Sequence, residues 1–180
     1  MEDSLEKALW VFGYGSIIWK VDFPFEARCT ACIRGWVRRF WQGSIDHRGI
    51  PGQPGRVVTL IERPDEICWG MAYRLPAGNN SDILDHLDHR ERGGYDRLDI
   101  DIYLSNEQPV KGITWFACEN NPNYLGEANP HTIARQIIGS KGPSGENIEY
   151  IYRLEEALSS INVSDPHVTQ IANEVRALQK

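Results

Sequence analysis

Short apolar or alternating segments follow one another through the first two-thirds of the chain, each bounded by glycine, proline or aspartate. Alternation with a period of two residues is typical of half-buried strands, and the bounding residue types favour turns. The expected strands cover residues 9–12, 29–33, 36–41, 57–61, 68–75, 98–104 and 113–116. A series of short strands of this kind favours a small mixed β-barrel, so we expect an α+β fold in which helices flank the barrel.

Helical patterns dominate the last third of the chain, where we expect helices over residues 131–139, 146–159 and 166–178. Ser144 is a candidate cap for the second helix, and Asp165 with Pro166 provides a capping carboxylate and a first-turn proline for the third. The chain has 180 residues, 41% of them hydrophobic, with no internal repeat and no low-complexity linker. We therefore expect residues 1–180 to form a single domain.

The charge distribution argues against a polyanion-binding protein. The formal net charge is −6, and the 19 basic residues are scattered along the chain, so we expect no nucleic-acid partner. No apolar run approaches the ~20 residues of a membrane helix, and the acidic start of the chain differs from the basic start of a secretory signal. We expect a cytoplasmic protein that does not associate with membranes. The sequence predicts no particular oligomeric state.

The cysteines and histidines do not form a recognisable metal-binding motif. Cys29 and Cys32 have the Cys-x-x-Cys spacing of a redox pair or half a zinc site, but no second pair accompanies them, and buried reduced thiols are the favoured interpretation. His86 and His89 lie three residues apart among aspartates, which is consistent with a surface metal site but more typical of a solvated helix face. We expect no metal and no cofactor.

Glu91 is the strongest catalytic candidate in the chain. Leu84, Leu87 and Glu91 follow a helical i, i+3, i+7 spacing, which places the carboxylate on the face that otherwise points inward. Gly93 is a natural residue to follow a helix end, so Glu91 is expected in the last turn, near the negative end of the helix dipole. Burial and the dipole both raise a carboxyl pKa, as a general base near neutral pH requires. Taken alone, without a partner motif, the pattern favours an ordinary exposed glutamate at a helix end.

A second candidate segment lies near the N-terminus, where an apolar strand is interrupted by Gly13 and Gly15. Glycines at this position allow the backbone to turn with its N–H groups exposed, and such a nest binds a carboxylate or a developing oxyanion. A bulge or a simple turn is the structural alternative. The dinucleotide-binding fingerprint Gly-x-Gly-x-x-Gly is not completed here.

Several blocks of sequence, in order along nearly the whole chain, resemble the ChaC family of glutathione-specific γ-glutamylcyclotransferases. They comprise residues 14–19, 34–44, 46–49, 54–60, 69–75, 90–95, 121–126 and 142–147. The resemblance implies a small mixed α and β fold built around a β-barrel. It also implies cleavage of glutathione to 5-oxoproline and cysteinylglycine, with Glu91 as the acid/base. The loop that receives the γ-glutamyl group would comprise Tyr14, Gly15, Ser16, Ile17, Ile18 and Trp19.

Departures from the family pattern are modest. Ile17 stands where leucine is usual, and Arg92 stands where lysine is common. Ser44 replaces an aspartate found in some members, which puts a polar contact at that position in question. None of these changes removes Glu91 or the loop glycines.

Two further residues are candidate substrate contacts. Arg48 has the planar fork needed to bind the glycyl carboxylate of glutathione, although a surface salt bridge explains it equally well. Tyr150 matches a tyrosine of the family pattern and is a candidate donor to the substrate, or simply a half-buried helix residue. The loop over residues 43–55 is unusually long, and either covers the site or is a plain surface excursion.

Three functions are consistent with these residues. The first is the glutathione cyclotransferase, and the second applies the same chemistry to other γ-glutamyl amino acids or γ-glutamyl amines. The third is a non-catalytic domain that binds a γ-glutamyl ligand, which is disfavoured because a carboxylate on an apolar helix face is costly to retain for binding alone.

Overall fold

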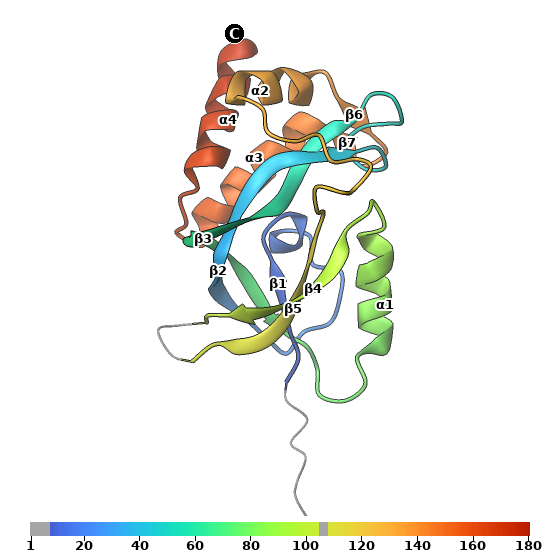
Figure 1. Cartoon of the computed structure of the whole chain (residues 1–180), viewed down its shortest axis with the longest axis vertical. Helices are drawn as coiled ribbons and strands as arrows, with labels where there is room; N and C mark the ends of the chain where they lie inside the picture. The colour runs from blue at the N-terminus through green and yellow to red at the C-terminus, as the bar shows by residue number, and fades with distance from the viewer. Residues whose placement is uncertain (1–7, 105–107) are drawn as a thin grey trace, which may run out of the picture.

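A five-stranded sheet forms the centre of the protein in the computed structural model, which describes residues 8–104 and 108–180 (Figure 1). Its strand order is β2-β3-β1-β5-β4. The strands are β1 (Trp10–Gly13), β2 (Ala27–Ser44), β3 (Gly55–Arg74), β4 (Asp96–Ile102) and β5 (Val110–Phe116). Strand β1 pairs antiparallel with β3 and parallel with β5, so the first strand of the chain lies in the middle of the sheet.

Strands β2 and β3 are each longer than the sequence pattern predicts, because each merges two expected strands. They pair from Ala27 opposite Arg74 to Ser44 opposite Gly55, with register shifts between Arg34 and Trp36 and again farther along. Gly35, at the first shift, has a φ of 83°, which a residue without a side chain adopts at little cost. The glycine that suggested a break therefore marks a bulge within one strand.

The sheet does not close into a barrel, so that part of the prediction is wrong. Within residues 8–104 and 108–180, one isolated bridge links the two edges of the sheet, between Cys32 on β2 and Tyr103 just after β4. Beyond that point β2 continues away from β4 toward the C-terminal helices, so no ladder joins the two edges (Figure 1). The mixed α+β class itself is confirmed by the observed elements.

The helices are α1 (Ser81–Arg90), α2 (Pro130–Ile138), α3 (Asn147–Ser160) and α4 (Pro166–Leu178). Figure 1 shows α2, α3 and α4 gathered at one end of the molecule, whereas α1 stands apart from them beside β4. Two-residue strands β6 (Lys141–Gly142) and β7 (Gly145–Glu146) lead into α3. The three expected C-terminal helices are each present to within one residue at either end.

The helix caps agree with the sequence in one case and not in another. The Asp165 carboxylate accepts hydrogen bonds from the backbone N–H groups of His167 and Val168, as expected for the start of α4. Ser144 does not cap α3; its hydroxyl lies 3.0 Å from Nδ1 of His47. Within the described residues, no helix combines the length and the apolar character needed to cross a bilayer.

Candidate active site

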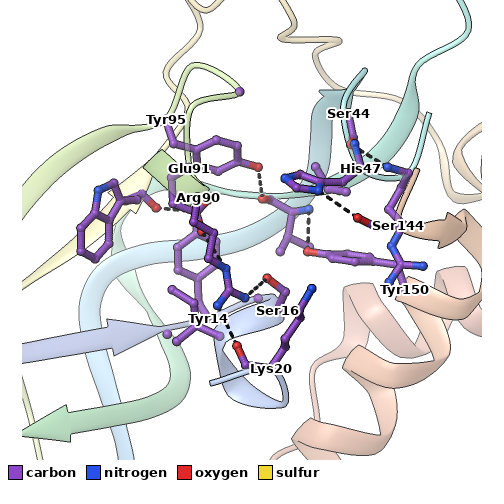
Figure 2. Close-up of a pocket in the computed structure, with 18 of the residues that line it drawn as sticks. Tyr14, Ser16, Lys20, Ser44, His47, Arg90, Glu91, Tyr95, Ser144 and Tyr150 are labelled. Atoms are coloured by element: carbon purple, nitrogen blue, oxygen red, sulfur yellow. Dashed lines mark hydrogen bonds and ion pairs between the residues drawn. The ribbon is translucent and has the colours of Figure 1, made fainter. Parts of the chain in front are cut away.

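A cavity of about 270 Å³ opens where β1 ends, between the end of α1 and the start of α3 (Figure 2). One wall is the segment after β1, which includes the short 3-10 helix η1 (Ser16–Ile18). Another wall comes from the loop between β2 and β3, which contributes Asp46, His47 and Arg48. The long loop over residues 43–55 therefore borders the cavity, as expected if it covers a site and is not a plain surface excursion. Glu91, just past the end of α1, and Tyr150 on α3 also line the cavity.

Glu91 lies just past the last helical residue of α1, with its side chain 18% exposed. Leu87, one turn earlier, is fully buried, so the inward face predicted from the i, i+3, i+7 spacing is confirmed. The prediction that Gly93 terminates the helix is wrong in detail, because Gly94 is the residue with a positive φ, of 93°. The Tyr95 N–H donates to the Glu91 carbonyl oxygen at 3.2 Å and closes the turn.

Burial is the main cause of an unusual pKa at Glu91. Desolvation of the carboxylate raises its pKa from an ordinary value of 4.5 to about 7. The Arg90 guanidinium opposes this rise, with its Nε 3.7 Å from Oε1 of Glu91, while the nearby charges of Asp46 and Asp22 add to it. The carboxyl therefore exchanges its proton near neutral pH, as the sequence suggested.

The raised pKa of Glu91 predicts a pH-dependent stability. Because the folded protein retains a proton that the unfolded chain loses above pH 4.5, the free energy of unfolding falls as pH rises through about 7. We expect Glu91 to contribute roughly 2–3 kcal/mol to this loss between pH 5 and pH 8. Urea denaturation at both pH values, for the wild type and for Glu91→Gln, measures it. An equal pH dependence in the two proteins would contradict this origin.

The segment from Tyr14 to Trp19 borders the cavity through Tyr14, Gly15, Ser16, Ile17 and Trp19. Within the described part of the chain, the N–H groups of Gly15, Ser16 and Ile17 form no hydrogen bond, so they are available to a ligand. The nest itself stays a prediction. Ile18 does not line the cavity, because its N–H donates to the Gly15 carbonyl oxygen at 3.0 Å and its side chain is buried. Its place in the predicted contact set is not supported.

The two tyrosines of the predicted set differ in their orientation. The Tyr14 hydroxyl donates to the Trp115 carbonyl oxygen at 2.7 Å, so this ring forms part of the cavity wall. The Tyr150 hydroxyl accepts a bond of 3.4 Å from the Val58 N–H. A Cβ at Gly15 would lie 3.2 Å from that hydroxyl, so the tyrosine approaches the nest directly. Burial raises the pKa of both tyrosines, and they remain neutral hydrogen-bonding groups.

The remaining predicted contacts, Trp19 and Arg48, both line the cavity. The Trp19 ring packs edge-on against Tyr150, with centroids 5.4 Å apart. Arg48 Nη1 donates to Oε2 of Glu149 and to the Glu146 carbonyl oxygen, both at 3.0 Å. Arg48 therefore forms the salt bridge that was one of its two interpretations, and it also borders the cavity, as a substrate contact would.

Comparison with known proteins places the chain in a family. A family model described as "ChaC-like protein" matches residues 9–178. Gamma-glutamylcyclotransferase 2-3 of Arabidopsis thaliana is 44% identical over 178 residues, covering 94% of this chain and 89% of that protein. Glutathione-specific gamma-glutamylcyclotransferase 1 of Danio rerio is 43% identical, covering 92% of this chain and 88% of that protein. This chain belongs to the ChaC-like family.

The fold agrees with that assignment. A crystal structure of the yeast gamma-glutamyl cyclotransferase specific to glutathione superimposes with a TM-score of 0.87 at 27% identity. The superposition covers 96% of this chain and all of the yeast chain. The resemblance to the ChaC family seen in the sequence is therefore confirmed, and the match includes both Glu91 and the loop after β1.

Sequence reasoning missed several residues at this ChaC-like site, and Arg90 is the most connected of them. Its guanidinium donates to the Lys20 carbonyl oxygen at 2.7 Å and to the Ser16 hydroxyl at 3.0 Å (Figure 2). It also donates to the Asp22 carboxylate at 2.6 Å. Arg90 thus ties the end of α1 to the segment after β1. The sequence offers no signal for this, because a helix-end arginine is usually exposed.

Ser44 and Tyr95 also have defined contacts. The Ser44 hydroxyl accepts from the N–H groups of His47 and Arg48 at 3.3 Å and 3.0 Å, so it shapes the loop that borders the cavity. The Tyr95 hydroxyl donates to the Val58 carbonyl oxygen at 2.8 Å. Tyr150 and Tyr95 therefore bond to the N–H and the carbonyl oxygen of Val58, respectively, in the cavity wall.

The cysteines and histidines lie mostly outside this site. All four cysteines are free; Cys32 and Cys68 are buried as predicted, whereas Cys29 and Cys118 are only partly so. Burial raises the pKa of Cys68 to about 11. His86 is half-exposed, with its Nε2 3.3 Å from Asp22. Among the described residues, no group of three or more potential metal-ligating side chains comes together.

Proposed function

We propose that this protein is a γ-glutamylcyclotransferase that cleaves glutathione to 5-oxoproline and cysteinylglycine. The observation that carries the proposal is the Glu91 carboxyl, whose pKa burial raises to about 7, beside a cavity bordered by the segment after β1. Relatives named glutathione-specific gamma-glutamylcyclotransferase support the choice of substrate. The competing substrates are other γ-glutamyl amino acids and γ-glutamyl amines.

The substrate supplies its own nucleophile in this reaction. The α-amine of the γ-glutamyl group attacks the γ-carbonyl carbon, closes a five-membered lactam and expels the amine of cysteinylglycine. Attack within one molecule reaches effective molarities of about 10⁵ to 10⁸ M when the reactive conformer is held, worth roughly 7–11 kcal/mol. The main task of the protein is therefore to hold the folded substrate and move one proton.

Glu91 is the proposed proton carrier. Its carboxylate removes a proton from the attacking α-ammonium nitrogen, and the resulting carboxylic acid returns a proton to the departing cysteinyl nitrogen, so no net proton is consumed by the side chain. A carboxyl with a pKa near 7 performs both steps, because neither protonation state is strongly disfavoured at neutral pH. Such transfers contribute about 10² to 10⁴ in rate.

The other predicted residues are proposed to position the substrate. The N–H groups of Gly15, Ser16 and Ile17 would receive either the α-carboxylate or the oxyanion of the tetrahedral intermediate, with Tyr150 as an additional donor. Arg48, held by Glu149, would bind the glycyl carboxylate through a free face of its guanidinium. Tyr14 and Trp19 would form the apolar wall. The chemistry itself requires neither a metal nor a cofactor.

The proposal is tested by incubating purified protein with glutathione, in the presence of a chelator, and measuring 5-oxoproline and cysteinylglycine. We expect both products in equal amounts. A parallel panel of γ-glutamylcysteine, γ-glutamyl amino acids and γ-glutamyl amines separates the glutathione-specific enzyme from the alternative. Absence of 5-oxoproline from every substrate would refute a cyclotransferase, and a preference for the dipeptides would replace glutathione as the substrate.

Two further expectations belong with this proposal. We infer that residues 1–180 act as one domain, because a contiguous buried core includes side chains from β1, from the C-terminal helices and from α1. We also propose a cytoplasmic location, where glutathione is abundant and thiols stay reduced, as four free cysteines require.

A further inference from the structure

The turn that carries Glu91 is anchored from outside by a segment distant in sequence. After α1 the chain forms a turn that is closed by the bond from the Tyr95 N–H to the Glu91 carbonyl oxygen. Asn121 Nδ2 donates to the Gly94 carbonyl oxygen in a short contact, and Asn123 Nδ2 approaches the Gly93 carbonyl oxygen at 3.5 Å.

Asn121 is held rigidly. It is 8% exposed, and its Oδ1 accepts two hydrogen bonds, from Gln42 Nε2 at 3.1 Å and from the Asn123 N–H at 2.8 Å. Because both donors occupy the oxygen, the amide group must present its nitrogen to Gly94. The backbone that follows Asn121 is tied to β2, since the Gly43 N–H donates to the Asn123 carbonyl oxygen and the Leu125 N–H donates to that of Trp41.

We propose that Asn121 is a positioning residue for Glu91: through the Gly94 carbonyl it keeps the turn closed and the carboxyl pressed into the cavity wall, away from water. The inference rests on the proposed function in assigning Glu91 the proton transfer. The effect of Asn121 on the exposure of the Glu91 carboxyl to water can be measured without any enzyme activity. Gly94 has a positive φ, which glycine adopts at little cost, so hydrogen bonds and not backbone strain determine whether the turn stays closed.

Loss of the anchor has a defined electrostatic consequence. The ionisable groups that influence Glu91 come from every surrounding element, namely Arg90 on α1, Asp22 after η1, Asp46 in the β2–β3 loop, Tyr14 after β1, Tyr95 after the turn and Tyr150 on α3. Burial outweighs these charges as the cause of the raised pKa. If the turn opens and water enters, the pKa of Glu91 falls toward 4.5 and the proton-transfer geometry is lost.

The test compares Asn121→Ala with the wild type by ¹³C NMR titration of labelled glutamate carboxyls, in which Glu91→Gln identifies the signal of Glu91. We expect the Glu91 pKa to fall by about one unit or more. We also expect kcat for glutathione to fall by about 10-fold to 10²-fold with KM changed less than threefold, since misplacing a catalytic group by about 1 Å costs up to about 10² in rate. Asn121→Asp is isosteric but directs an oxygen at the Gly94 carbonyl, so its kcat should fall comparably.

Asn129→Ala is the matched control. Asn129 caps α2 by accepting from the Thr132 N–H at 2.8 Å, so its loss costs similar stability far from the turn in sequence, with kcat and the Glu91 pKa unchanged. If Asn121→Ala does not fold, Gln42→Met releases Asn121 and also removes a buried Oε1 that has no partner in the described structure. A wild-type pKa and kcat in a folded Asn121 variant, or in Gln42→Met, would overturn the proposal. Should the wild type prove inactive, the NMR titration still decides the positioning role.

Discussion

Replacing Glu91 with glutamine should lower kcat for glutathione by about 10² to 10⁴. Glutamine keeps the size of the side chain and its hydrogen-bonding capacity but has no exchangeable acid proton. The amine would then have to lose its proton to water, and the cysteinyl amine would depart without a general acid. The measurement is single-turnover formation of 5-oxoproline at saturating glutathione. Binding should change little, because the donors proposed to hold the substrate lie on the segment after β1 and on Arg48, which line the same cavity.

Two comparisons make the Glu91 result specific. Asp85→Asn removes an exposed carboxylate from the same helix and should leave kcat unchanged. Glu91→Gln should also be at least as stable as the wild type at pH 8, because it removes a carboxylate that is ionised in a desolvated position. A folded Glu91→Gln protein with near wild-type turnover would exclude Glu91 from proton transfer.

Replacing Arg38 with methionine should destabilise the protein by about 3–5 kcal/mol, the cost of removing one partner of a buried ion pair. Arg38 is only 1% exposed. Its Nε donates to the Tyr14 carbonyl oxygen at 2.6 Å, its Nη1 to Asp165 at 2.7 Å, and its Nη2 to the carbonyl oxygen of Trp69. One side chain on β2 thus joins the segment after β1, strand β3 and the cap of α4.

Urea denaturation or thermal unfolding measures the loss at Arg38, which corresponds to a drop in Tm of roughly 10 °C for a chain of this size. Arg39→Met is the neighbouring control. Arg39 is partly exposed, and among the described residues its side chain bonds to the adjacent carbonyl oxygen of Arg38 alone, so its loss should cost less than about 1 kcal/mol. A loss below 1 kcal/mol in Arg38→Met would show that the buried network is not needed for the fold.

Local sequence patterns predicted most of the secondary structure correctly. Apolar alternation located the strands, and the Asp165 and Pro166 pair marked the start of α4. The errors arise where a local signal has two outcomes. Gly35 ends a strand or forms a bulge, and only pairing with β3 decides which. Closure of the sheet likewise depends on how far β2 diverges from β4. The alternation of apolar and polar residues along a strand carries no information on that distance.

In the candidate site, too, local sequence predicted some features correctly, and tertiary contacts decided others. The spacing from Leu87 to Glu91 predicted an inward-facing carboxyl, because the helical period alone determines which face a residue occupies. Ile18 was predicted to contact substrate from its position in the loop, but the turn of η1 directs it into the core. Ser144 was predicted to cap a helix and instead contacts His47 across the loop.

The order of the residues, by itself, determined the helical and strand periods, the inward face that carries Glu91, the glycines after β1 and the family resemblance. The periods, the inward face and the glycine positions depend on neighbours within a few positions along the chain, whereas the resemblance rests on the order of blocks along nearly all of it. The tertiary structure alone decided that Arg90 clamps Ser16, that Arg38 is buried beside Asp165, and that Asn121 holds the turn after α1. Those contacts join segments 27 to 127 residues apart, and their energies exist only once desolvation and packing have brought the partners together.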